Sequence, residues 1–169
     1  MLEIYRTPDT AFDGLEEFTF KPNYLEWEGL RTHFIDEGAR NGPVALLLHG
    51  EPTWSYLYRK MIPLLVKSGY RCIAPDHIGF GRSDKVLNDD WYVTDRHIER
   101  LRNFIEKLNL KTITPFVQDW AGPIGLVNVV EMPEKFERII ILNTWLHHDG
   151  FDYSADIKEW RSAATNRQW

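Results

Sequence analysis

The residues with the clearest chemical potential lie in the segment PFVQDWAGPIGL, at 115–126. An apolar, strand-like run leads into Asp119, and the small residue Ala121 then opens a helix-like pattern. This is the layout of a nucleophile elbow, a sharp strand-to-helix turn that exposes a reactive side chain. The five residues 117–121 do not match Gly-x-Ser-x-Gly, because valine comes first and an aspartate replaces the serine.

A carboxylate at that turn supports two interpretations. The dipole of the following helix would keep Asp119 ionised, and an ionised carboxylate can attack carbon to form an ester. It would need no general base, whereas a serine would need one at neutral pH. The alternative is that Asp119 only caps the helix. Spacing alone does not separate the two.

The elements that must position this turn alternate along the chain. Residues 43–54, 71–76 and 138–143 contain continuous apolar runs, which favour buried strands of a parallel sheet. Residues 112–119 are also strand-like, although Pro115 argues against a central position because proline lacks a ladder donor. The alternating residues 30–38 predict a half-buried strand.

Three segments have helical patterns. Residues 55–70 predict one helix that Ser55 caps, Pro63 kinks and Gly69 ends. Residues 94–110 and 121–136 predict two more. Strands that alternate with helices indicate an α/β fold with a parallel sheet.

Ligands of such sheets bind beyond the carboxyl ends of the strands. Three segments are predicted to meet at that edge: 49–54, 76–84 and 118–121. Their convergence is stronger evidence for a site than any single motif.

Composition excludes several classes of function. The 169 residues carry a net charge of −5, which does not favour nucleic acid or anionic membrane as a partner. The one cysteine, Cys72, lies in an apolar stretch and predicts a buried free thiol, which fits a cytoplasmic protein. We find no signal peptide, membrane span, metal-ligand spacing or phosphate-binding loop, and expect neither metal nor cofactor.

The sequence resembles the haloalkane dehalogenases of the α/β-hydrolase superfamily. The resemblance lies in residues 49–63, 74–85, 117–126 and 138–146, in family order. Glu51, in His-Gly-Glu-Pro, is similar to the branch with glutamate rather than asparagine there. The resemblance implies an α/β-hydrolase fold, with a mostly parallel sheet, flanking helices and a helical cap.

The resemblance also implies a mechanism and its residues. Asp119 would attack the halogen-bearing carbon of a haloalkane and expel halide, leaving an alkyl ester that water hydrolyses. The indole N–H of Trp120 would bind the halide. The backbone N–H groups of Trp120 and Glu51 would form the oxyanion hole, and the Glu51 side chain would help to hold the water.

Other residues carry weaker signals. Taken alone, Trp120 could be a core aromatic and Glu51 a solvated loop acid. We interpret Trp54 as packing and Ser83 as a loop hydrogen-bonder. His77 could line the site, His97 is expected to be structural, and 89–90 is expected to be a solvated turn.

The family pattern extends further than this chain. We expect residues 1–146 to form the N-terminal part of the core and 147–169 the start of an incomplete cap. The sixth strand, 138–142, would then be an exposed apolar edge, able to pair with other chains. Such a chain is expected to lack the late histidine base and the second acid, and so to be unable to complete turnover.

Several residues near the end are candidates for these roles. Asn143 occupies the place where one branch carries the second acid. His147 and His148 are poor substitutes for the base, because the family base comes from a loop after the last strand. Trp160 or Trp169 could supply a second halide ligand from the cap.

Two other functions remain open. An epoxide hydrolase of the same superfamily shares the nucleophilic aspartate, and Tyr153 lies near the region where its cap tyrosines are found. The Glu51 motif speaks against it. The second is a non-catalytic remnant or interaction module, which the missing histidine favours.

Overall fold

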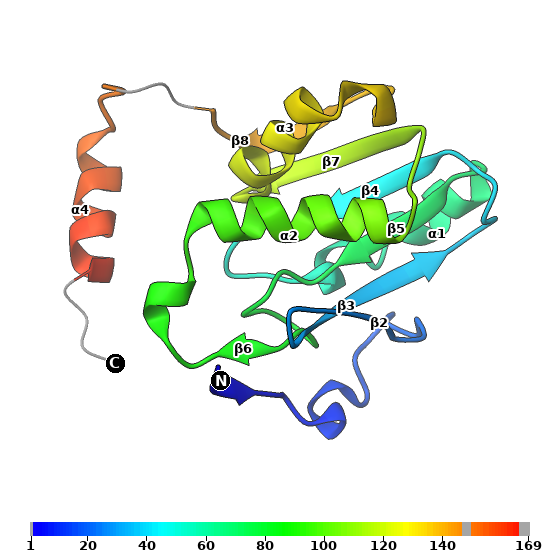
Figure 1. Ribbon diagram of the computed structural model, residues 1–169, viewed down its shortest axis with the longest axis horizontal. Coiled ribbons are helices and arrows are strands. Elements are labelled where there is room, and N and C mark those ends of the chain that lie inside the picture. The colour runs from blue at the N-terminus through cyan, green and yellow to red at the C-terminus, as the bar shows by residue number, and fades with distance from the viewer. Residues whose placement is uncertain (1, 147–149, 166–169) are drawn as a thin grey trace.

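A computed structural model describes residues 2–146 and 150–165, and a six-stranded sheet forms its centre (Figure 1). The strand order is β2-β3-β5-β4-β7-β8. The last four strands of that order run parallel, whereas β2 and β3 pair in antiparallel fashion. The strands are β2 (Asn23–Trp27), β3 (Leu30–Glu37), β4 (Val44–Leu48), β5 (Arg71–Pro75), β7 (Ile113–Asp119) and β8 (Ile140–Thr144), with a separate pair of β1 (Ile4–Tyr5) and β6 (Lys85–Val86).

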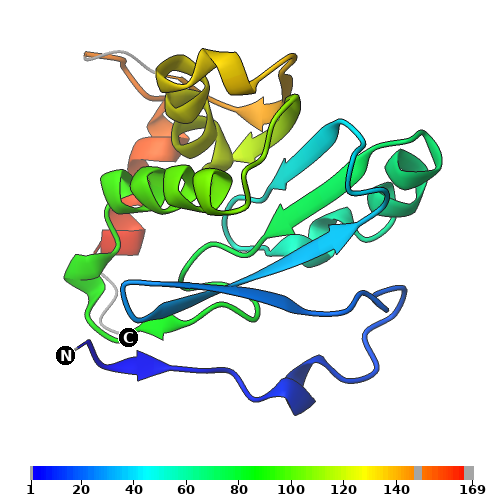
Figure 2. The same ribbon diagram turned by 45° about the vertical axis from the view of Figure 1, so that its right-hand side comes forward.

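Helices lie on both faces of the sheet, with α2 and α3 on one face and α1 on the other (Figure 2). The fourth α-helix, α4, stands apart from the sheet (Figure 1). Within the described ranges, no helix combines the length and apolar character needed to cross a bilayer. The helices are α1 (Met61–Lys67), α2 (Thr94–Lys107), α3 (Ala121–Glu131) and α4 (Ala155–Thr165), with short 3-10 turns η1 (Asp9–Phe12), η2 (Ser55–Tyr58), η3 (Asp89–Trp91) and η4 (Pro133–Lys135).

Strand β4 shows why its sequence is continuously apolar. Val44, Leu46 and Leu48 pack with residues of α2 and α3, whereas Ala45 and Leu47 pack with residues of α1. Successive side chains of a strand point to opposite faces, so a strand covered on both faces needs no polar position. All five residues are buried, as the apolar run predicts.

The prediction of one helix over 55–70 is wrong. The segment forms the turn η2 and then α1, which begins only at Met61. Pro63 therefore lies in the first turn of α1, where a missing N–H breaks no helical hydrogen bond, and it neither kinks nor ends the helix. Gly69, at φ +90°, follows the helix as expected.

Pro115 does not exclude a central strand, contrary to the sequence-based argument. Strand β7 lies between β4 and β8, and Pro115 pairs with Leu46 of β4. The pairing of β7 with β8 begins only at the next residue, Phe116, which pairs with Ile140. The missing donor therefore falls before that pairing begins.

The predicted burial of residues 138–143 is also wrong. Among the described residues, strand β8 pairs with β7 and has no strand on its other side, and Ile140 and Ile141 expose 37% and 60% of their surface. An apolar run predicts a strand but not how many neighbours it has. The exposed apolar edge that we expected for the sixth strand is present in β8.

Candidate active site

The three predicted segments meet beyond the carboxyl ends of β4, β5 and β7. The backbone N–H of Glu51 donates a 2.9 Å hydrogen bond to Oδ1 of Asp119. The backbone N–H of His77 donates to Nε2 of His49, also at 2.9 Å. These two bonds tie the loop after β4 to the other two segments, as the topology predicts.

Asp119 lies on a sharp turn between β7 and α3. Its φ is +53°, a left-handed conformation that costs energy for a residue with a Cβ atom. From β8, Thr144 Oγ1 donates a 2.6 Å hydrogen bond to the Asp119 carbonyl oxygen. A Cβ atom at Gly122 would collide with that threonine, so glycine is required for α3 to start so close to β8. The turn has the geometry of a nucleophile elbow.

The loop after β4 packs directly against the carboxylate. A Cβ atom at Gly50 would lie 2.3 Å from Cβ of Asp119, so only glycine fits there. This close approach brings the Glu51 N–H within hydrogen-bonding distance of the Asp119 side chain. Glycine is therefore required on steric grounds at the second position of His-Gly-Glu-Pro.

A cavity of about 290 Å³ lies beside the elbow, in the size range of small-molecule sites. Trp120, which follows the carboxylate, borders it and packs edge-on against Trp145, with ring centroids 5.2 Å apart. The lining is mainly apolar and comprises Gly50, Glu51, His77, Phe80, Tyr92, Val93, Thr94, His97, Trp120 and Ile124. An apolar cavity beside a carboxylate suits a small, uncharged organic substrate.

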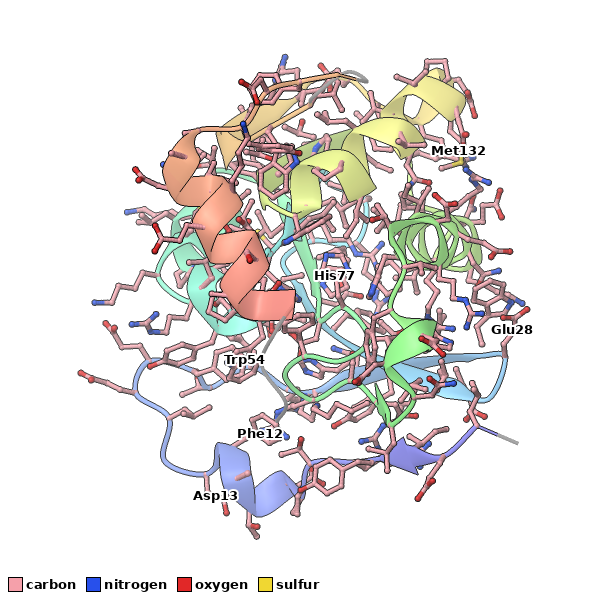
Figure 3. The ribbon with its side chains drawn as sticks, turned by 90° about the vertical axis from the view of Figure 1, so that its left-hand side faces the viewer. Phe12, Asp13, Glu28, Trp54, His77 and Met132 are labelled. Carbon is pink, nitrogen blue, oxygen red and sulfur yellow. The ribbon has the colours of Figure 1, made fainter. Side chains whose placement is uncertain are left out.

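Three histidines form one wall of this region. The His77 ring lies between those of His49 and His97, at centroid distances of 4.6 and 5.8 Å. Burial lowers the pKa of all three imidazoles, that of His97 to about 4. For His77, the nearby His49 and His97 rings, when charged, would lower the pKa further. These imidazoles are therefore neutral at neutral pH. Figure 3 shows His77 in the interior of the molecule.

The lesser predictions have mixed outcomes. Trp54 packs against Phe12 and Phe18, as expected (Figure 3). Ser83 is a buried loop hydrogen-bonder, since its Oγ donates to the Asp76 carbonyl at 2.6 Å. His97 is not only structural, because it lines the cavity.

Sequence reasoning missed Thr144 and the cavity residues 92–94. Thr144 is the last residue of the apolar strand β8, and no motif marks it. Residues 92–94 end one loop and start α2, so only the fold shows that they reach the site.

The described residues near the end of the chain provide no support for a second acid or a cap tyrosine. Asn143 is exposed, with φ +37°, and Tyr153 is not among the residues that line the cavity. Residues 147–148 and 169 lie outside the described residues, as does the side chain of Trp160. In 2–146 and 150–165, no group of three or more His, Cys, Asp or Glu side chains could hold a metal ion.

The comparisons with known proteins agree with this fold and geometry. The model of the alpha/beta hydrolase fold family matches residues 43–166, and the chain belongs to this family. A haloalkane dehalogenase of Psychrobacter cryohalolentis is 45% identical over 165 residues, which are 95% of this chain and 54% of that protein. The chain thus spans about half the length of the curated relatives it matches.

Solved structures of two related enzyme types are also similar to this chain. The tetrameric haloalkane dehalogenase DpaA of Paraglaciecola agarilytica is 40% identical, with a TM-score of 0.93 over 98% of this chain and 57% of that one. A structure described among novel epoxide hydrolases from hot-environment metagenomes is 29% identical, with a TM-score of 0.69 over 75% and 43%. The chain is therefore more similar to these two haloalkane dehalogenases than to that epoxide hydrolase.

Proposed function

We propose that the complete protein hydrolyses haloalkanes to an alcohol and a halide through an ester on Asp119. One observation carries this proposal: the carboxylate stands on an elbow beside a mainly apolar cavity. One of its oxygens accepts the Glu51 N–H. A serine or cysteine nucleophile would need an activating base, whereas this carboxylate does not.

In the first step, an Asp119 oxygen forms a bond to the halogen-bearing carbon as the carbon–halogen bond breaks. The electron pair of that bond leaves with the halide. We assign the Trp120 indole N–H as the donor to the halide, since it would act where negative charge develops. Trp120 borders the cavity and is 37% exposed, so its ring is accessible to a substrate.

In the second step, water would add to the ester carbonyl of Asp119. We assign the backbone N–H groups of Glu51 and Trp120 as the oxyanion hole, and the Glu51 side chain as a ligand of the water. Hydrolysis would also need a general base to activate the water, which the family resemblance places on a histidine with a carboxylate partner. We assign neither among residues 2–146 and 150–165.

We also propose that residues 1–146 belong to the hydrolase core and that 147–169 begin a cap. Helix α4 supports this division, because it lies beyond the carboxyl ends of the parallel strands (Figure 1). A cap would need to lie on that side to cover the cavity.

One tyrosine of the cavity lining bears on the epoxide-hydrolase alternative. Such an enzyme needs tyrosine hydroxyls to polarise the epoxide oxygen, and Tyr92 is the tyrosine among the described residues of the cavity lining. Its hydroxyl donates to the Val86 carbonyl oxygen and accepts the Val86 N–H. It is therefore already engaged.

Separate incubations with one substrate of each class distinguish the two functions. The purified protein would be incubated with 1-bromobutane and, separately, with 1,2-epoxybutane, with bromide and diol measured and the Asp119 peptide checked for an adduct. We expect bromide release or a butyl ester from the first substrate, and no diol or adduct from the second. An adduct from the epoxide alone would support the alternative, and no adduct from either would favour a non-catalytic module.

We further propose that the β8 edge mediates self-association, because Ile140 and Ile141 are exposed on a strand with a free side. Ile141→Lys should shift sedimentation toward the monomer. Val130→Lys is the matched control, since Val130 is an exposed apolar residue on α3. An equal effect of both substitutions would contradict an edge-specific contact.

A further inference from the structure

We propose that His49 is a positioning residue, whose imidazole orients the Gly50–Glu51 peptide so that the Glu51 N–H points at Asp119. The proposal deepens the proposed function and rests on it, because that N–H is one of the two donors assigned to the oxyanion hole. His49 would not touch the reacting atoms. It would act through the peptide plane beside it.

The geometry follows from the planarity of one peptide unit. The carbonyl oxygen of Gly50 and the N–H of Glu51 belong to the same trans peptide and point in opposite directions. Nδ1 of His49 lies 2.9 Å from that oxygen, and Oδ1 of Asp119 lies 2.9 Å from that nitrogen. The peptide is therefore held at both ends, and rotation about its flanking bonds would break both contacts.

The partners of the imidazole define its tautomer. A carbonyl oxygen only accepts, so Nδ1 must carry the hydrogen that is donated to Gly50. The backbone N–H of His77 donates to Nε2, so Nε2 must be the acceptor. Both hydrogen bonds exist together only in the neutral form protonated at Nδ1.

The surroundings favour that neutral form. His49 is fully buried, and burial lowers its pKa despite the opposing influence of the Asp76 charge and the bond to Gly50. Protonation would place a second N–H against the N–H of His77. The network therefore links β5, the loop after β4 and the elbow through one imidazole with both nitrogens satisfied.

Two near-conservative variants separate the two bonds. In His49→Asn, the amide N–H occupies about the place of Nδ1 and can still donate to Gly50, but the acceptor for His77 is lost. In His49→Gln, the longer amide can accept from His77, but the donor to Gly50 is lost. Ser83→Ala is the stability control, because Ser83 is buried and its Oγ bonds the backbone of His33 and Asp76 rather than the Gly50–Glu51 peptide.

The test measures, in the complete protein to which the proposed function applies, the lifetime of the butyl ester by rapid quenching and intact mass, and kcat and KM separately. Loss of one oxyanion donor costs about 10²–10³ in kcat, so a misdirected donor should cost at least about tenfold. We expect His49→Gln to lengthen the ester lifetime by that factor and to lower kcat and KM together, with kcat/KM nearly unchanged, because the slowed step follows ester formation. The ester lifetime and kcat of His49→Asn and Ser83→Ala should stay within about threefold of wild type. This should hold even where their loss of Tm equals or exceeds that of His49→Gln.

A second readout does not depend on activity. The Glu51 amide proton donates to a carboxylate, and its NMR chemical shift should move upfield in His49→Gln but not in His49→Asn. Equal effects of the two variants on this shift and on the ester lifetime would overturn the proposal. If wild type forms no ester, the proposed function fails, and the amide shifts still decide whether His49 orients the peptide.

Discussion

Two aspartates at the same edge of the sheet have opposite surroundings. Asp76 directly follows β5 and is fully buried, whereas Asp119 ends β7 and is partly exposed. The Asp76 carboxylate accepts hydrogen bonds from the backbone N–H groups of Ser55 and Arg82, at 2.9 Å each, and from Nδ1 of His33 at 2.8 Å. The Asp119 carboxylate accepts the Glu51 N–H.

The difference shows how one residue type acquires two roles. Burial alone would raise the pKa of Asp76, but the hydrogen bond and charge of His33, with His49 and Ser55, outweigh it and lower that pKa. A carboxylate held by donors on every side is a structural anchor and a poor nucleophile. A carboxylate on an exposed elbow keeps an oxygen available for attack.

The largest expected effect comes from Asp119→Asn. An amide cannot form the ester, so bromide release from 1-bromobutane should fall at least about 10³-fold. The unfolding free energy should change little, because the amide oxygen can still accept the Glu51 N–H. Ion chromatography of bromide and thermal unfolding check the two parts, and retained bromide release in a folded variant would contradict the assigned role.

Asp76→Ala should act mainly on stability, whereas Asp119→Asn acts mainly on bromide release. The substitution leaves two backbone N–H groups and buried His33 without their acceptor, at a cost of about 3–5 kcal/mol in unfolding free energy. Urea denaturation measures this loss. A loss below about 1 kcal/mol would show that the two aspartates do not differ as described.

Mild acid should weaken the fold through the protonation of His97. The pKa of His97 is lowered to about 4 in the folded protein, against about 6.5 when unfolded, so the unfolded chain binds more protons between these values. Stability should therefore be fully present above about pH 6.5 and fall toward pH 4. His97→Gln should flatten this part of the urea-denaturation profile, and an unchanged slope would contradict the assignment to His97.

Below that range Asp76 adds a second loss. Its folded pKa is depressed, so its contribution to stability is present above its unfolded pKa of about 3.9 and lost as the pH falls further. Asp76→Ala should remove this component, which a proton-uptake measurement on unfolding can detect.

The smallest effect is expected from Thr144→Val, which removes the hydrogen bond to the Asp119 carbonyl but keeps the shape of the side chain. The loss should be about 1 kcal/mol in unfolding free energy, with a larger relative effect on ester formation than on stability. Single-turnover kinetics with 1-bromobutane would show this. Unchanged ester formation would mean that the turn does not need this support.

The sequence predicted the elements and the meeting of three segments because apolar runs and helical periodicity report local burial. It predicted Asp119, Glu51 and Trp120 as neighbours because parallel strands end at one edge. The apolar run at 138–143 wrongly predicted burial, since an apolar strand looks the same with one neighbour or two. The exposed edge was expected only from the family resemblance. Nor could the sequence predict the helix start at Met61, because the segment before it has the same apolar spacing.

The site contacts outside the sequence motifs could not be predicted either. Thr144 supports the elbow from a neighbouring strand, and no local pattern marks a threonine that bonds a carbonyl 25 residues away. The tautomer of His49 depends on the backbone of His77, which is close only after folding. Such contacts depend on tertiary geometry, which spacing along the chain does not encode.

The most direct test of the contrast between the two aspartates is peptide mapping after exposure to excess 1-bromobutane. The protein would be digested under mildly acidic conditions that preserve esters, and tandem mass spectrometry would assign any butyl group. We expect the butyl group on Asp119, and no butyl group on Asp76 in the same digest. A butyl ester on Asp76, or on surface carboxylates with Asp119 unmodified, would contradict the account.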